Sequence, residues 1–129
     1  RYLSEWIPLL FKERLENAPV IGNITYLEQV FDQVDQKALK IFLERALSES
    51  GRIVVLINKQ ENQLNWMIGH SVQQGFDLME LIREDLPLMD AKGGGKGQLV
   101  QGGGRNVDGI AEFLVNVRHK LERKIKNHE

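Results

Sequence analysis

The sequence has 129 residues, of which 42% are hydrophobic and 27% are charged, a balance typical of one globular domain. It contains no cysteine, which excludes disulfides, thiolate metal sites and a catalytic cysteine, and agrees with a reducing cytoplasm. No run approaches the roughly 20 apolar residues of a membrane helix, and no secretory signal opens the chain, so we expect no membrane association. Because the chain begins with Arg1 and not with methionine, we expect a fragment of a longer protein.

The net charge of −1 hides an uneven distribution along the chain. Residues 1–91 carry 9 Lys and Arg against 14 Asp and Glu, whereas residues 92–129 carry 8 against 4. An acidic body with a basic C-terminal third can steer a polyanion to one face, but a chance imbalance on solvated helices would give the same counts. Charge alone leaves both interpretations open.

The chain opens with a predicted helix. Apolar residues recur at helical spacing from Tyr2 to Leu15. Because proline lacks an N–H donor and suits the first turn of a helix, Pro8 favours a helix that starts close to residue 8. An apolar stripe outside the main domain needs another protein surface against which to pack. Residues 1–18 are therefore predicted to form an N-terminal helix that acts as a linker or a dimerisation element.

A small sheet is predicted to follow. β-Branched and aromatic residues predict a strand over Ile24–Val30, and Asp35 is placed to cap an amphipathic helix of about three turns. The apolar run Ile53–Ile57 is typical of a central strand that is covered on both faces. Leu64–Gly69 is predicted to form a hairpin with that strand across a polar turn.

Two more helices are predicted around a glycine-rich segment in the C-terminal part. The first ends before Pro87, and the second runs from about Val107 to Lys124 with Asn106 or Asp108 as its cap. The predicted fold class is α/β (α+β): a small mixed β-sheet flanked by helices, with a leading N-terminal helix. Apart from that leading helix, we expect a single domain over residues 19–129.

The segment from Lys92 to Arg105 holds seven of the twelve glycines in the chain. Glycine backbones can approach a ligand closely, and successive exposed N–H groups form a concavity that binds anions. The segment also carries three basic residues, and it leads into the last helix, whose N-terminus favours anions. We therefore predict a glycine-rich loop that grips phosphate. Its candidate phosphate- or nucleic-acid-binding residues are Lys92, Gly93, Gly94, Gly95, Lys96, Gln101, Gly102, Gly103, Gly104 and Arg105.

Other uses of a glycine-rich segment fit less well. A flexible linker would carry more serine and fewer basic residues, and it would not hold an apolar Leu99-Val100 pair between two amphipathic helices. A nucleotide P-loop requires Ser or Thr after its lysine, but Gly97 follows Lys96. A dinucleotide fingerprint requires a βαβ unit, and no strand follows the last predicted helix.

A glycine triplet, a basic residue, a short spacer and then Gln101-Gly102-Gly103 before a final helix resemble the DHH-associated domain. That domain ends alanyl-tRNA synthetases, some free-standing alanyl-tRNA editing proteins and the DHH phosphodiesterases. The resemblance extends over residues 20–125, because the predicted strands and helices occur in the family's order. The phosphodiesterases usually place histidine where this chain has Lys96, which is closer to the basic residue of the synthetase branch. Gly97-Gln98 depart from that branch, in which a proline and a polar or acidic residue are common.

The resemblance implies a tRNA-binding C-terminal domain with no catalytic residue of its own, which presents RNA to an upstream aminoacylation or editing domain. It implies tRNA, in particular tRNA(Ala), and that upstream domain as partners, a cytoplasmic location, and a homodimer through the N-terminal helix as one option. The parent would be a synthetase-related ligase or an editing hydrolase. Zinc or ATP would belong to the upstream part, and no cofactor is expected in this chain.

Two other functions stay open. One is the substrate-binding domain of a DHH-type phosphodiesterase that acts on short oligonucleotides or cyclic dinucleotides. The other is a dimerisation module whose glycines only permit tight packing.

The remaining candidate sites are weaker. His70, His119 and His128 are scattered without metal-ligand spacing, so no metal site is predicted, and His70 is treated as a packing or capping residue. Ser71 lies beside His70, but no acid is placed to complete a catalytic triad.

Aromatic and basic side chains supply the last candidates. Trp6, Trp66 and Phe76 are able to stack on bases, although aromatic residues at such spacing are usually core. The basic residues of the final helix would either continue a phosphate-binding track or complement the helix dipole. They are Arg118, Lys120, Arg123, Lys124 and Lys126.

Overall fold

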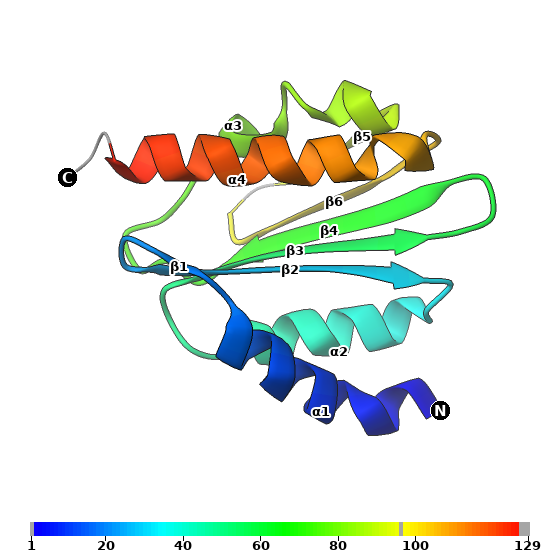
Figure 1. Ribbon diagram of the computed structural model, residues 1–129, viewed down its shortest axis with the longest axis horizontal. Helices are drawn as coiled ribbons and strands as arrows, with labels where there is room; N and C mark the ends of the chain where they lie inside the picture. Colours follow the sequence, from blue (N-terminus) through cyan, green and yellow to red (C-terminus); the bar gives the residue numbers. More distant parts are fainter. Residues whose placement is uncertain (1, 96, 127–129) are drawn as a thin grey trace.

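The computed structural model describes residues 2–95 and 97–126, and within them it describes every side chain except those of residues 2–8 and 11. In chain order the elements are α1 (Tyr2–Asn17), β1 (Val20–Ile21), β2 (Ile24–Asp32), α2 (Gln36–Ala46), β3 (Arg52–Lys59), β4 (Leu64–His70), α3 (Leu78–Ile82), η1 (Leu86–Met89), β5 (Ala91–Gly94), β6 (Leu99–Gly104), η2 (Val107–Gly109) and α4 (Ile110–Lys126). The predicted mixed sheet flanked by helices, with a helix leading, is confirmed (Figure 1).

The strands form one sheet in the order β1-β2-β3-β4-β6-β5. β2 and β3 run parallel and are connected through α2, whereas the other neighbouring pairs are antiparallel. The predicted hairpin of β3 and β4 is confirmed, with Lys59 paired to Leu64 beside the turn. β1, which the sequence pattern did not indicate, forms one edge of the sheet, and β5 forms the other.

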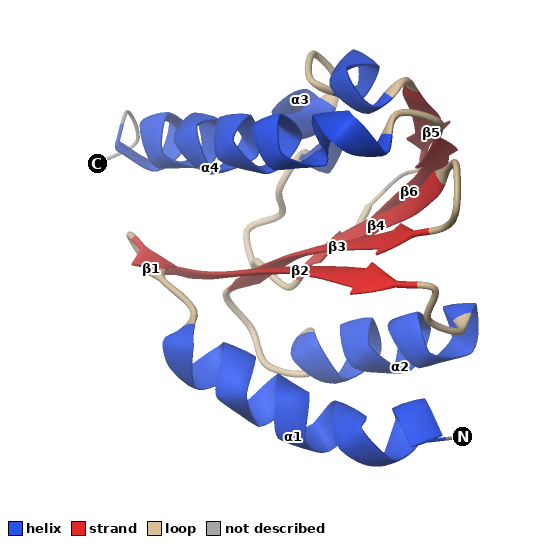
Figure 2. Cartoon of the chain, turned by 45° about the vertical axis from the view of Figure 1, so that its right-hand side comes forward, coloured by secondary structure: helices blue, strands red, loops and turns tan. Residues whose placement is uncertain are grey.

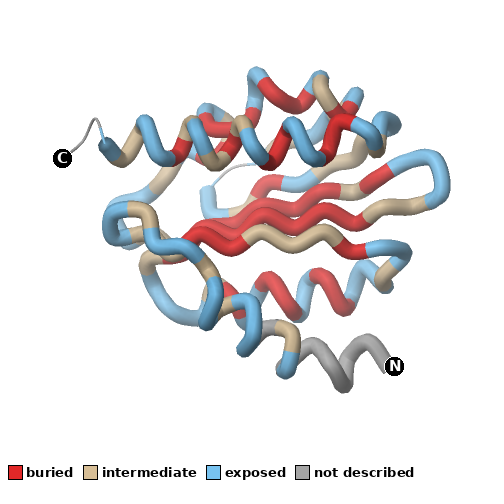
Figure 3. The backbone as a smooth tube through the Cα atoms, in the orientation of Figure 1, coloured by how far each residue is buried: buried red, intermediate tan, exposed pale blue. Residues whose placement is uncertain are grey.

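Local sequence signals account for α2 and β3. The Asp35 carboxylate accepts a hydrogen bond from the Lys37 backbone N–H at 3.2 Å and caps the first turn of α2, as predicted. Apolar residues then recur every three or four positions, so one stripe of α2 is buried against the sheet. β3 is buried from Arg52 to Asn58 because helices cover both faces of the sheet (Figure 3).

Helices lie on both faces of the sheet, and each face has its own core (Figure 2). α3, η1 and α4 cover one face, where Tyr26, Trp66 and Phe113 are among the largest buried side chains. α1 and α2 cover the other face around Phe42 and Met67. These two helices lie beneath β2 and β3 (Figure 2). Leu99 at the start of β6 packs against this core, whereas Gln101 of β6 and Lys92 of β5 are exposed.

Pro19 follows the end of α1, as expected, but Pro8 and Pro87 did not mark helix ends. α1 begins at Tyr2, and Pro8 lies inside it, where the proline removes one backbone donor. The helix predicted to end before Pro87 ends at Ile82, and Pro87 opens the 3-10 helix η1 instead. Proline suits the first turn of a helix because the N–H groups there have no partner within the helix.

Candidate nucleic-acid interface

The glycine-rich segment is a β-hairpin, and the prediction of a loop is wrong for Gly93, Gly94 and the second triplet, whereas Gly95 lies outside the strands. Gly93-Gly94 end β5, and Gly102–Gly104 end β6. The two strands pair antiparallel from Ala91↔Gly104 to Gly94↔Gln101, and the turn between them includes Gly97, whose φ is 76°. Because β6 lies between β4 and β5, the backbone groups of its glycines face ladder partners on both sides.

Close packing requires several of these glycines. A Cβ on Gly93 would collide with the Gln101 carbonyl oxygen and would lie 2.8 Å from the Trp66 ring. A Cβ on Gly102 would collide with the Lys92 carbonyl oxygen, and one on Gly104 would lie 2.7 Å from the Met89 carbonyl oxygen. These three glycines therefore let β5, β6 and the Trp66 side of the core approach one another.

The hairpin separates the predicted site residues into two groups. Lys92, Gly103, Gly104 and Arg105 line one hollow of about 410 Å³, together with Asn65 from β4. Lys92 and Arg105 are exposed and have no ion pair among the described residues. Asp90 also lines this hollow and reduces its positive charge.

The turn forms the second group at the opposite end of the hairpin. Gly95 and Gly97 line a hollow of about 390 Å³ beside Arg83 of the segment after α3. The predicted contact Lys96 lies outside the described residues. Gln101 is exposed on β6 and pairs with Gly94. The sequence motif missed Asn65 and Arg83, because strand pairing and helix packing bring them in from distant parts of the chain.

Ion pairs occupy much of the predicted basic track on α4. Arg118 pairs with Glu28 at 3.2 Å, Lys120 with Asp85 at 2.7 Å, and Lys124 with Glu80 at 2.8 Å. Burial alone would lower the pKa of Lys120, but its hydrogen bonds to Asp85 and Glu84 raise it above the ordinary value. The side chains of α4 therefore serve partly to hold the helix on the domain.

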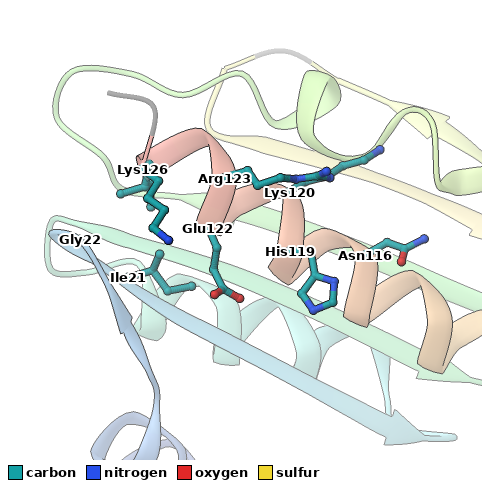
Figure 4. A pocket seen from close by; sticks show the side chains of 9 residues that line it. Ile21, Gly22, Asn116, His119, Lys120, Glu122, Arg123 and Lys126 are labelled. Carbon is teal, nitrogen blue, oxygen red and sulfur yellow. The ribbon is translucent and has the colours of Figure 1, made fainter. Parts of the chain in front are cut away.

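Arg123 and Lys126 have no ion pair among the described residues. They line a hollow of about 720 Å³ between β1 and α4, next to Ile21 (Figure 4). Both lie in the last turn of α4, where positive charge complements the helix dipole.

The aromatic candidates belong mainly to the core. Trp66 is 1% exposed and cannot stack on a base in this conformation. Phe76 is half-buried, with the Lys124 Nζ 5.1 Å from its ring centroid. The Trp6 side chain lies outside the described residues.

His70 is a packing and capping residue, as predicted. Its side chain is buried, its Nδ1 accepts a hydrogen bond from the Val72 N–H at 3.0 Å, and its ring lies 6.2 Å from the Phe76 ring. Within residues 2–95 and 97–126, no three His, Cys, Asp or Glu side chains are placed to hold a metal ion. None of the described helices is both long and apolar enough to cross a membrane.

Burial lowers the pKa of His70 below its ordinary value of 6.5. The unfolded chain therefore takes up this proton more readily than the folded chain, and stability contributed by neutral His70 is lost as the pH falls below 6.5. We expect the melting temperature to fall between pH 7 and pH 5, with a contribution from this one proton of at most about 1.4 kcal/mol per pH unit.

Thermal denaturation of the wild type and of His70→Asn over this pH range checks the prediction. Asparagine keeps an acceptor for the Val72 N–H but does not titrate, so its curve should be flatter. If the melting temperatures of the two proteins fell in parallel with pH, His70 would not be the cause of the loss of stability.

The DHHA1 domain family matches residues 23–125. The alanine–tRNA ligase of Leptospira biflexa serovar Patoc is 29% identical over 90 residues, which are 67% of this chain and 10% of that protein. That of Lactococcus lactis subsp. cremoris is 28% identical over 113 residues, 84% of this chain and 12% of the ligase. The chain thus spans about a tenth of the length of these curated relatives.

Two solved structures share the fold. The C-Ala domain from Aquifex aeolicus alanyl-tRNA synthetase aligns with a TM-score of 0.73 at 24% identity, over 82% of this chain and 98% of that chain. RecJ from Thermus thermophilus, in complex with Mg²⁺, aligns with a TM-score of 0.61 at 13% identity, over 98% of this chain and 18% of RecJ. The resemblance predicted over residues 20–125 is confirmed, and the chain belongs to the DHHA1 domain family.

Proposed function

We propose that the chain is the tRNA-binding C-terminal domain of an alanyl-tRNA synthetase-like protein or of a free-standing alanyl-tRNA editing protein. The observation that carries the proposal is the hollow at the end of the hairpin, where exposed Lys92 and Arg105 stand without ion pairs among the described residues, in a chain of the DHHA1 domain family. The alanine–tRNA ligases among its relatives support the choice of tRNA as the ligand.

In this function Lys92 and Arg105 contact backbone phosphates and position the RNA without reading its sequence. The turn glycines Gly95 and Gly97 would add a second phosphate contact at the other end of the hairpin, and Lys96 is proposed as a further phosphate contact. The glycines Gly93, Gly102 and Gly104 contribute by allowing the strands to pack closely, which fixes where the basic side chains stand.

The proposal extends to the parent protein. An upstream domain would carry the aminoacylation or editing chemistry, with any ATP or zinc, and tRNA(Ala) would be the shared substrate in the cytoplasm. α1 would connect the two parts or pair with a second copy. The alternative of a phosphodiesterase substrate domain has only the fold shared with RecJ in its favour, and Lys96 stands where that branch usually has histidine.

A salt titration of tRNA binding tests the proposal. We expect the affinity of the chain for tRNA to fall steeply with salt, because bound lysine and arginine release counterions. Lys92→Ala with Arg105→Ala removes two phosphate contacts and should reduce the slope of log K against log [salt] by about 1.5. Fluorescence anisotropy with labelled tRNA gives both values.

Lys37→Ala with Lys40→Ala is the matched control, because both lysines are exposed on α2 and have no ion pair among the described residues. This control should keep the wild-type slope. No tRNA binding at low salt, or equal slopes for the two double variants, would contradict the proposed role of the hollow.

A further inference from the structure

Two glycines of the hairpin are not required by packing. A Cβ on Gly103 would lie 3.5 Å from the Leu64 carbonyl oxygen and 3.7 Å from Asn65 Oδ1, which is ordinary contact, and a Cβ on Gly94 would meet nothing within 4 Å. Neither residue has the positive φ that favours glycine. Neither backbone conformation nor crowding explains the missing side chains at these positions, in contrast to Gly93 and Gly102.

Both of these glycines lie on the same side of the hairpin. Residues directly opposite each other in an antiparallel pair share a face. Gly103 pairs with Lys92 on one side and with Asn65 on the other, and Gly94 pairs with Gln101. Gln101 lies in register with Met67, which belongs to the core under α2, so this face lies on the same side of the sheet as α2, and Gln101 and Lys92 are exposed there.

We call this surface the open hairpin face, and its residues are Asn65, Lys92, Gly94, Gln101 and Gly103. It consists of two bare stretches of backbone between two carboxamides and a lysine. Lys92, Gly103 and Asn65 line the same hollow as Arg105, so the face continues into the phosphate-binding hollow proposed above.

We propose that the open hairpin face holds an unpaired nucleotide of the bound RNA, an inference that rests on the proposed function. The base lies against the backbone at Gly103 and Gly94, where no side chain keeps it away. The carboxamides of Asn65 and Gln101 donate and accept hydrogen bonds at the base edge, and Lys92 and Arg105 hold the adjoining phosphates.

The chemistry of the face favours a nucleotide over a peptide or a bare phosphate. None of its five residues is apolar and bulky, so it offers little to a hydrophobic peptide. A bare phosphate would use the charges of Lys92 and Arg105, but it would leave the carboxamides and the bare backbone of the face without a role. RNA-binding sheets commonly recognise unpaired bases that stack on side chains of the strands and are hydrogen-bonded at their edges. On the open hairpin face, the bare backbone at Gly94 and Gly103 takes the place of the stacking side chains.

Gly94→Val tests the inference, because it places a branched side chain on the open hairpin face where a Cβ meets nothing within 4 Å, at a residue that does not line the phosphate-binding hollow. We expect the variant to bind single-stranded oligo(A) of about 12 nucleotides roughly tenfold more weakly, with an unchanged salt slope. Binding of a short RNA duplex, which offers phosphates without free bases, should stay at the wild-type level. The melting temperature should be unchanged or higher, because valine favours strands.

Two further variants complete the design. Gly102→Ala, on the opposite face, should lower the melting temperature, since its Cβ would collide with the Lys92 carbonyl oxygen. Gln101→Ala, at an exposed position, should repeat the loss of oligo(A) binding without affecting the fold, even if Gly94→Val were to unfold.

The outcomes separate the two proposals. Wild-type oligo(A) binding in Gln101→Ala and in a folded Gly94→Val would overturn the nucleotide site and leave the proposed phosphate-binding hollow standing. An equal loss of duplex and oligo(A) binding in Gly94→Val would also overturn the nucleotide site, because the face would then contact phosphates and no base. No binding of any RNA by the wild type would refute the proposed function and this inference together.

Discussion

Gly109→Ala is expected to lower the free energy of unfolding by about 3 kcal/mol, at the upper end of what overpacking costs. Gly109 is buried at the end of η2, and a Cβ there would collide with the Leu88 carbonyl oxygen of η1 and lie 2.6 Å from its carbonyl carbon. Leu88 cannot easily retreat, because its carbonyl also accepts a hydrogen bond from Asn106 Nδ2 at 2.9 Å. The next carbonyl, that of Met89, accepts from the Arg105 and Asn106 N–H groups.

Urea denaturation followed by circular dichroism measures this loss. Gly103→Ala is the matched control, since a Cβ at that position meets only ordinary contacts, and it should be as stable as the wild type or slightly more stable. Surface substitutions usually change the free energy of unfolding by less than about 0.5 kcal/mol. A change this small in Gly109→Ala would contradict the prediction, because it would show that η1 and η2 can move apart without loss of stability.

Lys120→Met is expected to lower the free energy of unfolding by about 2 kcal/mol, because it leaves the Asp85 carboxylate without its cation. The Lys120 and Asp85 side chains are 22% and 10% exposed, and their charged atoms lie 2.7 Å apart. The Asn116 amide donates to the other Asp85 oxygen at 3.1 Å, so the cluster joins α4 to the segment between α3 and η1. Methionine replaces the apolar stem of the lysine and removes only the charge.

A double-mutant cycle identifies the cause. Asp85→Asn in the Lys120→Met background removes the unpaired charge and keeps an acceptor for Asn116, so the double variant should recover part of the loss. Lys40→Met, at an exposed position on α2, should change stability by less than about 0.5 kcal/mol. Strictly additive losses for Lys120→Met and Asp85→Asn would show that the two residues do not interact.

The helices and strands that apolar periodicity marks were predictable. The run Ile53–Ile57, the stripe on α2 and the Asp35 cap each have a direct physical cause in neighbouring residues, and each occurs as predicted. β5 and the glycine end of β6 were not predictable in this way. Glycine has low strand propensity and leaves no alternation to detect, and these residues become strands through pairing with each other and with β4, where Gly93, Gly102 and Gly104 permit a close approach.

The sequence indicated which segment carries the candidate site, but it did not indicate how the residues of that segment are arranged in space. The motif singled out Lys92, before the first triplet, and Arg105, after the second, and the structure places both at one hollow. It grouped them with Gly95 of the turn, on the assumption that residues near in sequence are near in space. The β5–β6 pairing instead puts the turn at the far end, and the β4–β6 pairing brings in Asn65.

The β5 edge of the sheet has a consequence for how the domain meets other molecules. β5 consists of an alanine, a lysine and two glycines. A short edge strand that carries lysine is a poor template for another chain's strand, so copies of the domain are poor partners for edge-to-edge pairing at β5. In the proposed function, RNA therefore contacts the side chains and the bare backbone on the face of the hairpin, and no strand is added at this edge.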